Sequence, residues 1–350
     1  MTRRVVQPAP SKSTVFECPA ARPYRQLTLH LSTEIFPSRH IASETARPAG
    51  VETPIPLRWI VAATLAGIAA LAILLEYVHI DIALNGAAMG FGLAGLVLFS
   101  IRHLFRRGGL RARPMLSDSA EDALLFIVIS LAGAVASYGV AALTHGWVDG
   151  TMVQFDSAVG FDWNALYALT AAHPAIQWIG RIAYASIFAS PALILLAFAR
   201  NAQRDEARRF LASFLLAAMI SLTLFRWLPT LGPLVYSWHG PIVYMPTSGL
   251  YQADLIPLLR DGRAGPIDLG HLRGLVGPPS FHAASATLYI LAAWRTRHLR
   301  WPLTGINAAM LLSIPVEGTH YAIDVVSGTA VALAAHIVIE WLARRRIHGT

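Results

Sequence analysis

The fold of this chain is decided by two short sequences near its carboxyl end, GPPSFHAAS (residues 277–285) and EGTHYAIDVVSG (residues 317–328). Each contains one histidine, His282 in the first and His320 in the second. The chain between them consists of two apolar runs separated by a basic break, which predicts a helical hairpin with both histidines at the same end. Asp324 follows His320 by one helical turn, so three polar side chains are expected to meet there.

The composition is that of a membrane protein. Of the 350 residues, 55% are hydrophobic and only 14% are charged, and the mean hydropathy is +0.51. The net charge of +8 comes almost wholly from arginine, because Lys12 is the only lysine. Such an excess usually lies in cytoplasmic loops, so we expect no nucleic-acid partner. With Cys18 as the only cysteine, an intramolecular disulfide, a cysteine-based zinc site and an iron–sulfur cluster are excluded.

Eight apolar segments predict an all-α, polytopic membrane helix bundle. Most are near the length of about 20 residues that a bilayer requires. The segments cover residues 57–78, 82–101, 123–143, 182–198, 210–228, 282–294, 301–316 and 321–342. We interpret residues 57–343 as a single transmembrane domain.

The two ends of the chain have a different character. Residues 1–56 are rich in Pro, Ser, Thr and Arg without helical or strand periodicity, which predicts a disordered tail. Arg3 and Arg4 are followed by polar sequence rather than by an apolar run, so no cleavable signal is expected. Residues 344–350 form a short basic tail.

The arginines predict how the bundle is oriented. They are concentrated in every second connection and after the last segment, whereas residues 144–180 contain no Lys or Arg. By the positive-inside rule both termini are cytoplasmic and the two histidines face outward from the cell membrane. A connection of about 50 residues, between the fifth and sixth segments, lies on the same outer side. Such a length is typical of a lid or binding element.

The hairpin helices are short, which sets the depth of the histidines. The 13 residues from His282 to Trp294 span about 20 Å, against a hydrocarbon core of about 30 Å. Both histidines should therefore lie at or slightly below the lipid headgroups. A site at this depth suits a phosphate that acyl or prenyl chains hold in the membrane.

The spacing of His320 and Asp324 predicts chemistry. At i and i+4 they share one helix face, so the carboxylate can accept a hydrogen bond from one imidazole nitrogen and leave the other free to attack. A facing His282 could then protonate the leaving group. Backbone amides of residues 280–283, at a helix start, would suit phosphate oxygens.

These residues resemble the type-2 phosphatidic acid phosphatase superfamily, and more closely its branch that includes the inositol phosphorylceramide synthases. The superfamily has three motifs, K-x6-R-P, P-S-G-H and S-R-x5-H-x3-D. The second is matched by Pro279, Ser280 and His282, and the third by Ser313, His320 and Asp324. The resemblance, over residues 120–343, implies a six-helix core behind an N-terminal pair. It also implies His320 as nucleophile, Asp324 as its partner and His282 as general acid.

The first motif is not recognisable, so other cations are candidates for holding phosphate. We rank Arg260 first, because its RDG element precedes the P-S-x-H sequence in this branch, and Arg226 also qualifies, with Arg263 and Arg273 behind. Ser280 completes the predicted substrate site. Glu317 is interpreted as a residue that caps or hydrogen-bonds the loop near His320.

The predicted function is a metal-independent phosphatase or phosphotransferase that acts on a lipid phosphate or diphosphate without a cofactor. Water would make it a hydrolase, whereas an alcohol such as inositol would make it a transferase, and the residues leave both open. Two other classes also remain, namely a transporter that uses the His/Asp set as a proton relay and a non-catalytic membrane protein. The sequence does not predict an oligomeric state.

Overall fold

The computed structural model describes residues 55–107 and 113–348, and all regular elements in that part of the chain are helices. The all-α fold predicted from the sequence is confirmed. In chain order the helices are α1 (Leu57–Tyr77), α2 (Gly86–Arg107), α3 (Pro114–Leu143), α4 (Asp149–Ala158), α5 (Trp163–Ala172), α6 (Pro174–Arg200), α7 (Arg204–Phe225), α8 (Pro233–Tyr236), α9 (Tyr251–Arg260), the 3-10 turn η2 (Leu269–His271), α10 (Phe281–Ala293), α11 (Arg300–Glu317) and α12 (Ala322–His348).

The helices form a membrane bundle. Within the described ranges, six are long and apolar enough to cross a bilayer, namely α1, α2, α3, α6, α7 and α12. The other two predicted segments are the shorter α10, with 13 residues, and α11, with 18. All eight predicted segments are therefore helical. The predicted N-terminal tail falls almost entirely outside the described residues.

Three helices begin well before the residues that the hydropathy pattern predicts. α3 starts at Pro114 rather than near residue 123, α6 at Pro174 rather than near residue 182, and α7 at Arg204 rather than near residue 210. Proline suits the first helical turn because its missing N–H has no partner to lose there. In α3 the early turns carry acidic residues that interrupt the apolar run. Their charge is compensated by α7, since Arg208 pairs with Glu121.

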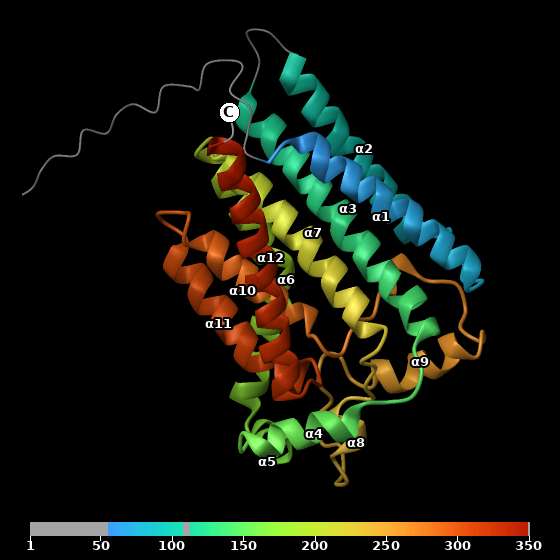
Figure 1. Ribbon diagram of the computed structural model, residues 1–350. Helices are drawn as coiled ribbons and strands as arrows, with labels where there is room; N and C mark the ends of the chain where they lie inside the picture. Colours follow the sequence, from blue (N-terminus) through green and yellow to red (C-terminus); the bar gives the residue numbers. More distant parts are fainter. Residues whose placement is uncertain (1–54, 108–112, 349–350) are drawn as a thin grey trace, which may run out of the picture. The chain divides into compact units, whose positions relative to one another are not determined.

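One end of the bundle carries the arginine-rich ends of the helices, and we call it the basic end. Ion pairs there join α2, α3, α7 and α12: Arg102 lies 2.6 Å from Glu121, which also binds Arg208, and Arg209 lies 3.2 Å from Glu340. In Figure 1 the carboxyl end of α12 marks this end at the top. The pairs hold the four helices together where the sequence predicts the cytoplasmic face.

The short helix α10 lies at the centre of the bundle. It packs against α6, α7, α11 and α12, and every residue from 283 to 289 is buried. A helix that is apolar all round is expected to be buried on all sides. Alanine and serine in its first turns allow neighbouring backbones to approach closely. The amino end of α10, which carries His282, is thereby fixed in the core.

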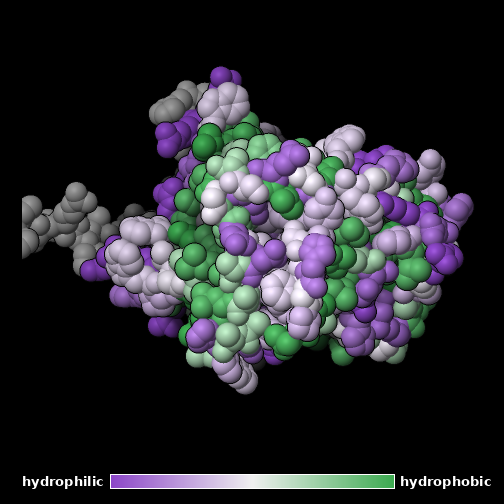
Figure 2. Space-filling model, turned by 90° about the horizontal axis from the view of Figure 1, so that it is seen from below, coloured by the Kyte–Doolittle hydropathy of each residue, from purple (hydrophilic) through white to green (hydrophobic). Residues whose placement is uncertain are grey.

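The opposite end of the bundle, which we call the site end, is built from α4, α5, α8 and α9 (bottom of Figure 1). The long connection between α7 and α10 lies there and contains α8, α9 and η2, so it is partly helical. These helices have four, ten and three residues, too short to form the apolar runs that identify membrane segments. Figure 2, seen from this end, shows hydrophilic and hydrophobic residues mixed over the surface.

Candidate active site

His320 and Asp324 form a buried pair at the start of α12. His320 Nδ1 lies 3.1 Å from Asp324 Oδ2, and the side chains are 4% and 1% exposed. The backbone N–H of Tyr321 donates to the same carboxylate oxygen at 3.2 Å. Because the carboxylate accepts from Nδ1, the other ring nitrogen, Nε2, carries the lone pair. Nε2 has no hydrogen-bond partner in the part of the chain that the structure describes.

Ser280 joins the start of α10 to the start of α12. Its hydroxyl caps α10 by accepting from the Ala283 N–H at 3.4 Å, and its own N–H donates to the Asp324 carbonyl oxygen at 3.0 Å. A Cβ at Gly328, on the next turn of α12, would lie 2.2 Å from the Ser280 carbonyl oxygen. Only glycine permits this approach. The start of α10, which contains His282, therefore packs directly against the backbone of α12, the helix that follows His320.

A tyrosine from α6 brings His282 and His320 together. The Tyr184 ring stacks on His282 with 4.2 Å between the ring centroids, and its hydroxyl lies 3.3 Å from His282 Nδ1. A Cβ at Gly318 would lie 2.7 Å from His320 Cδ2 and 3.2 Å from Tyr184 Cε2. Both rings therefore border the same small volume, and three aromatic rings from α6, α10 and the α11–α12 turn are clustered. Tyr184 was not predicted from the sequence.

Asp149, the first residue of α4, fixes the backbone around this cluster. Its buried carboxylate accepts the N–H groups of Leu231 and Gly232, at 2.9 and 3.1 Å, and the Tyr321 hydroxyl at 2.8 Å. Gly232 has a φ of 87°, and a Cβ there would lie 2.9 Å from the Thr319 carbonyl oxygen. The segment after α7 is thus held directly against the turn that carries His320.

Glu317 binds the connection between α8 and α9 to the turn that follows α11. Its buried carboxylate accepts the Thr247 hydroxyl at 2.6 Å, the Thr247 N–H at 3.1 Å and the Tyr244 hydroxyl. The Ser248 N–H donates to the Glu317 carbonyl oxygen at 2.8 Å. Arg181 donates to the Tyr244 oxygen at 2.9 Å. These contacts agree with the interpretation of Glu317 as a residue that hydrogen-bonds the loop.

The two highest-ranked phosphate-binding candidates lie in different surroundings. Arg260 donates to Thr144 Oγ1 at 3.0 Å and to the Gly146 carbonyl oxygen at 2.9 Å, and its guanidinium lies over the Trp147 ring. Burial lowers the pKa of Arg260 below its ordinary value. The side chain of Arg226, half-buried after α7, makes no hydrogen bond or ion pair with any described residue. Within the described ranges, no hydrogen bond or ring contact joins either arginine to His282 or His320.

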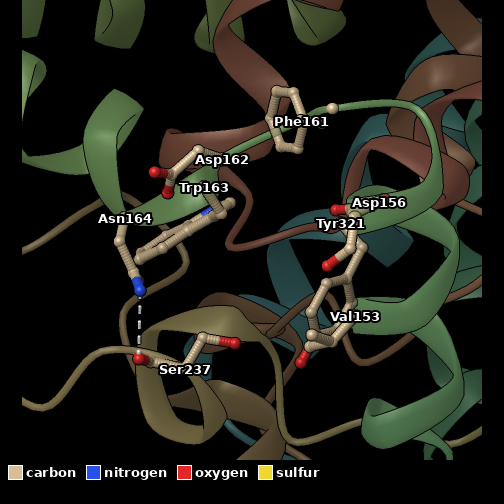
Figure 3. Close-up of a pocket in the computed structure, with 10 residues that line it drawn as sticks. Val153, Asp156, Phe161, Asp162, Trp163, Asn164, Ser237 and Tyr321 are labelled. Carbon is tan, nitrogen blue, oxygen red and sulfur yellow. Dashed lines mark hydrogen bonds between the residues drawn. The ribbon is translucent and has the colours of Figure 1, made fainter.

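A pocket opens beside the start of α12. It has a volume of about 380 Å³, and Figure 3 shows Asp156 and Tyr321 on one side of it and Trp163 and Asn164 on the other. Asp156 accepts the first two N–H groups of α12, from Ala322 and Ile323, at 2.9 and 3.1 Å. Burial raises the pKa of Asp156, against the effect of these hydrogen bonds. The lining contains carboxylates, hydroxyls, an amide and aromatic rings, but no Lys, Arg or His.

These features define the class of the protein as an integral membrane helix bundle with a buried His–Asp pair at one end. No group of three or more His, Cys, Asp or Glu that could hold a metal ion occurs among residues 55–107 and 113–348. Residues 150–338, more than half of the chain, match the family model described as the PAP2 superfamily. The chain belongs to this superfamily. No curated protein and no solved structure is significantly similar to it.

Proposed function

We propose that this protein transfers the phosphoryl group of a membrane lipid phosphate or diphosphate through a phosphohistidine on His320. The observation that carries the proposal is the buried His320–Asp324 pair, which shares a neighbour with His282: the Tyr184 ring stacks on His282 and, with the His320 ring, borders Gly318. Burying a carboxylate is costly unless it is paired, and ionisable groups at membrane depth usually mark function. Membership of the PAP2 superfamily supports a lipid phosphatase-type activity in general.

The chemistry takes two steps. The Nε2 lone pair of His320 attacks phosphorus, the bond from phosphorus to the leaving oxygen breaks, and that oxygen takes a proton from His282. Asp324 accepts the Nδ1–H and stabilises the positive charge that develops on His320. Water or an alcohol then attacks the phosphorus, gives up its proton to His282, and releases His320. The site requires no metal ion or cofactor in this scheme.

The backbone at the amino end of α10 would bind the transferred phosphoryl group. A helix amino terminus presents N–H groups and a favourable dipole to an anion. The N–H groups of Ser280 and Ala283 are already hydrogen-bonded, so the donors proposed for phosphate are those of Phe281 and His282. Arg260 and Arg226 are the proposed cationic contacts. The arginine distribution supports an orientation with this end of the bundle at the outer leaflet and both termini in the cytoplasm.

A second candidate is transfer to an alcohol rather than to water, as in phosphoinositol transfer to a lipid acceptor. The pocket beside Tyr321 favours it, because a lining with carboxylates and no cation suits a neutral, hydroxyl-bearing group better than a free anion. Tyr321 directly follows His320 in the chain. Inositol phosphorylceramide synthase-like activity would follow from such a pocket.

Purified protein in lipid nanodiscs tests both candidates. We expect metal-independent, vanadate-sensitive release of phosphate from lipid phosphates, or new phospholipid products when inositol is present. The variant His320→Ala should lose nearly all of the activity, whereas the control His336→Ala, within the following helix α12, should keep it. Full activity of His320→Ala would overturn the proposal. Proton-coupled transport without phosphate release would favour the transporter class, and chelator sensitivity would favour a metal site.

A further inference from the structure

The side chain of Tyr184 contacts His282 both by ring stacking and by a hydrogen bond. The two rings are nearly parallel, with an interplanar angle of 13° and 4.2 Å between centroids. The Tyr184 hydroxyl lies 3.3 Å from His282 Nδ1 and 3.1 Å from Ser248 Oγ. Tyr184 and Ser248 are each 6% exposed. In the described residues, no other side chain forms a hydrogen bond with His282.

The two histidines of the site therefore have different partners. Among the described residues, Asp324 forms a hydrogen bond with the His320 ring and none with His282. A carboxylate stabilises an imidazolium, whereas a phenol orients the ring without adding charge. A histidine that must give a proton away is better served by the neutral partner.

We propose that Tyr184 is the positioning residue of the general acid. This inference rests on the proposed function. In the protonated form of His282, Nδ1–H donates to the Tyr184 oxygen and the Tyr184 O–H donates to Ser248 Oγ. The stacked phenol fixes the plane of the imidazole, and the hydrogen bond fixes Nδ1. Nε2–H then points to the leaving oxygen and supplies the proton in the first step.

The chain holds Tyr184 and Ser248 in place from two further directions. Ser248 N–H donates to the Glu317 carbonyl oxygen at 2.8 Å. One residue further on, Gly318 leaves room for both the Tyr184 and His320 rings. The same contacts thus set the position of the acid relative to the nucleophile.

The inference predicts that the loss on removing the Tyr184 hydroxyl depends on the leaving group. An alkyl phosphate lipid has a poor leaving group that needs protonation, whereas p-nitrophenyl phosphate has a good one that does not. General acid catalysis raises a rate by about 10²- to 10⁴-fold, and a misplaced acid should lose part of this acceleration. For Tyr184→Phe, which keeps the ring, we expect kcat/KM to fall roughly 10- to 100-fold on the lipid and less than about threefold on p-nitrophenyl phosphate.

The control is Tyr289→Phe. Tyr289 is also a buried tyrosine, on the same helix as His282, and its hydroxyl donates to the Ile187 carbonyl oxygen at 3.3 Å. A purely structural effect lowers the rate on both substrates by the same factor. For Tyr289→Phe we expect either no loss or such an equal loss on both substrates. If Tyr184→Phe fails to fold, Ser248→Ala tests the same hydrogen bonds and should show the same leaving-group dependence at a smaller amplitude.

His282→Ala and His320→Ala separate the inference from the proposed function. His282→Ala should share the leaving-group dependence of Tyr184→Phe, and His320→Ala should be inactive on both substrates. Equal losses on both substrates, or no loss, in Tyr184→Phe while His282→Ala stays selective would overturn the inference alone. Activity of His320→Ala on both substrates would overturn the proposed function itself.

Discussion

Replacing Gly328 with alanine would place a methyl group against the backbone of α10. The added Cβ would lie 2.2 Å from the Ser280 carbonyl oxygen and 3.0 Å from Ala283 Cβ. Ordinary contacts begin at 3.4 Å. The nearest atom belongs to a backbone and not to a flexible side chain, so α10 and α12 would have to separate by about 1 Å.

The separation has a cost in stability and a cost in activity. Overpacking of this kind destabilises by about 1–3 kcal/mol, which lowers Tm by roughly 2–10 °C in a chain of this size. The shift also moves His282 away from His320. A displacement of about 1 Å at a catalytic group costs about 10²-fold in rate, so we expect kcat to fall by that order.

Thermal unfolding in detergent and phosphate release in nanodiscs measure the two effects. The matched control is Gly133→Ala in α3, where an added Cβ would meet no atom within 4 Å. It replaces glycine with a better helix former and should keep or raise Tm. A Gly328→Ala variant with the Tm and kcat of the wild type would refute the argument that the contact of α10 with α12 positions the site.

Three further predictions concern other parts of the bundle. Arg208→Met should lower the free energy of unfolding by about 3–5 kcal/mol, because it removes a positive charge beside the carboxylates of the partly buried Glu121 and the buried Asp122. Arg263→Met breaks only an exposed ion pair with Asp261 and should change Tm little, and equal effects of the two variants would contradict this. Burial and the hydrogen bond to Glu317 raise the pKa of Tyr244 to about 12. Because this tyrosine ionises at a lower pH in the unfolded chain, Tm should fall as pH rises from about 10 to about 12. The Tm of Tyr244→Phe should fall less over the same range. If Arg226 or Arg260 binds the substrate phosphate, its replacement by Gln should raise KM for lipid phosphate at unchanged Tm; a variant that lowers Tm alone has only a structural role.

Much of the fold could be predicted because membrane helices follow local rules. Apolar runs identified all eight apolar helices, and the error at the start of α3 came from acidic residues that only a neighbouring helix explains. Asp118, Glu121 and Asp122 interrupt hydropathy in α3, but arginines from α7 lie beside them. No property of one segment reveals a partner more than 80 residues away.

The same limit applies to the site. The contact of His320 with Asp324 could be expected from their spacing, but not its geometry, because His320 lies in the turn before α12 rather than on a face of the helix and its Nδ1 contacts the carboxylate from there. The contact of Tyr184 with His282 could not be expected, because a tyrosine in an apolar helix usually packs in the core. Only the fold shows which ring it faces. Asp149 lies in the stretch 144–180, which the sequence distinguished only by its lack of Lys and Arg. The burial of its carboxylate depends on two segments that come later in the chain.

The order of synthesis gives Asp149 a role in when the site forms. Its donors lie 82, 83 and 172 residues further along, at Leu231, Gly232 and Tyr321. Because the chain is made from its amino end, this carboxylate stays without its last partner until α11 has been inserted and Tyr321 has emerged. Folding of the site end therefore finishes late. A nascent chain that stops before α12 carries His282 and His320 but lacks Asp324, the hydrogen-bond partner of His320.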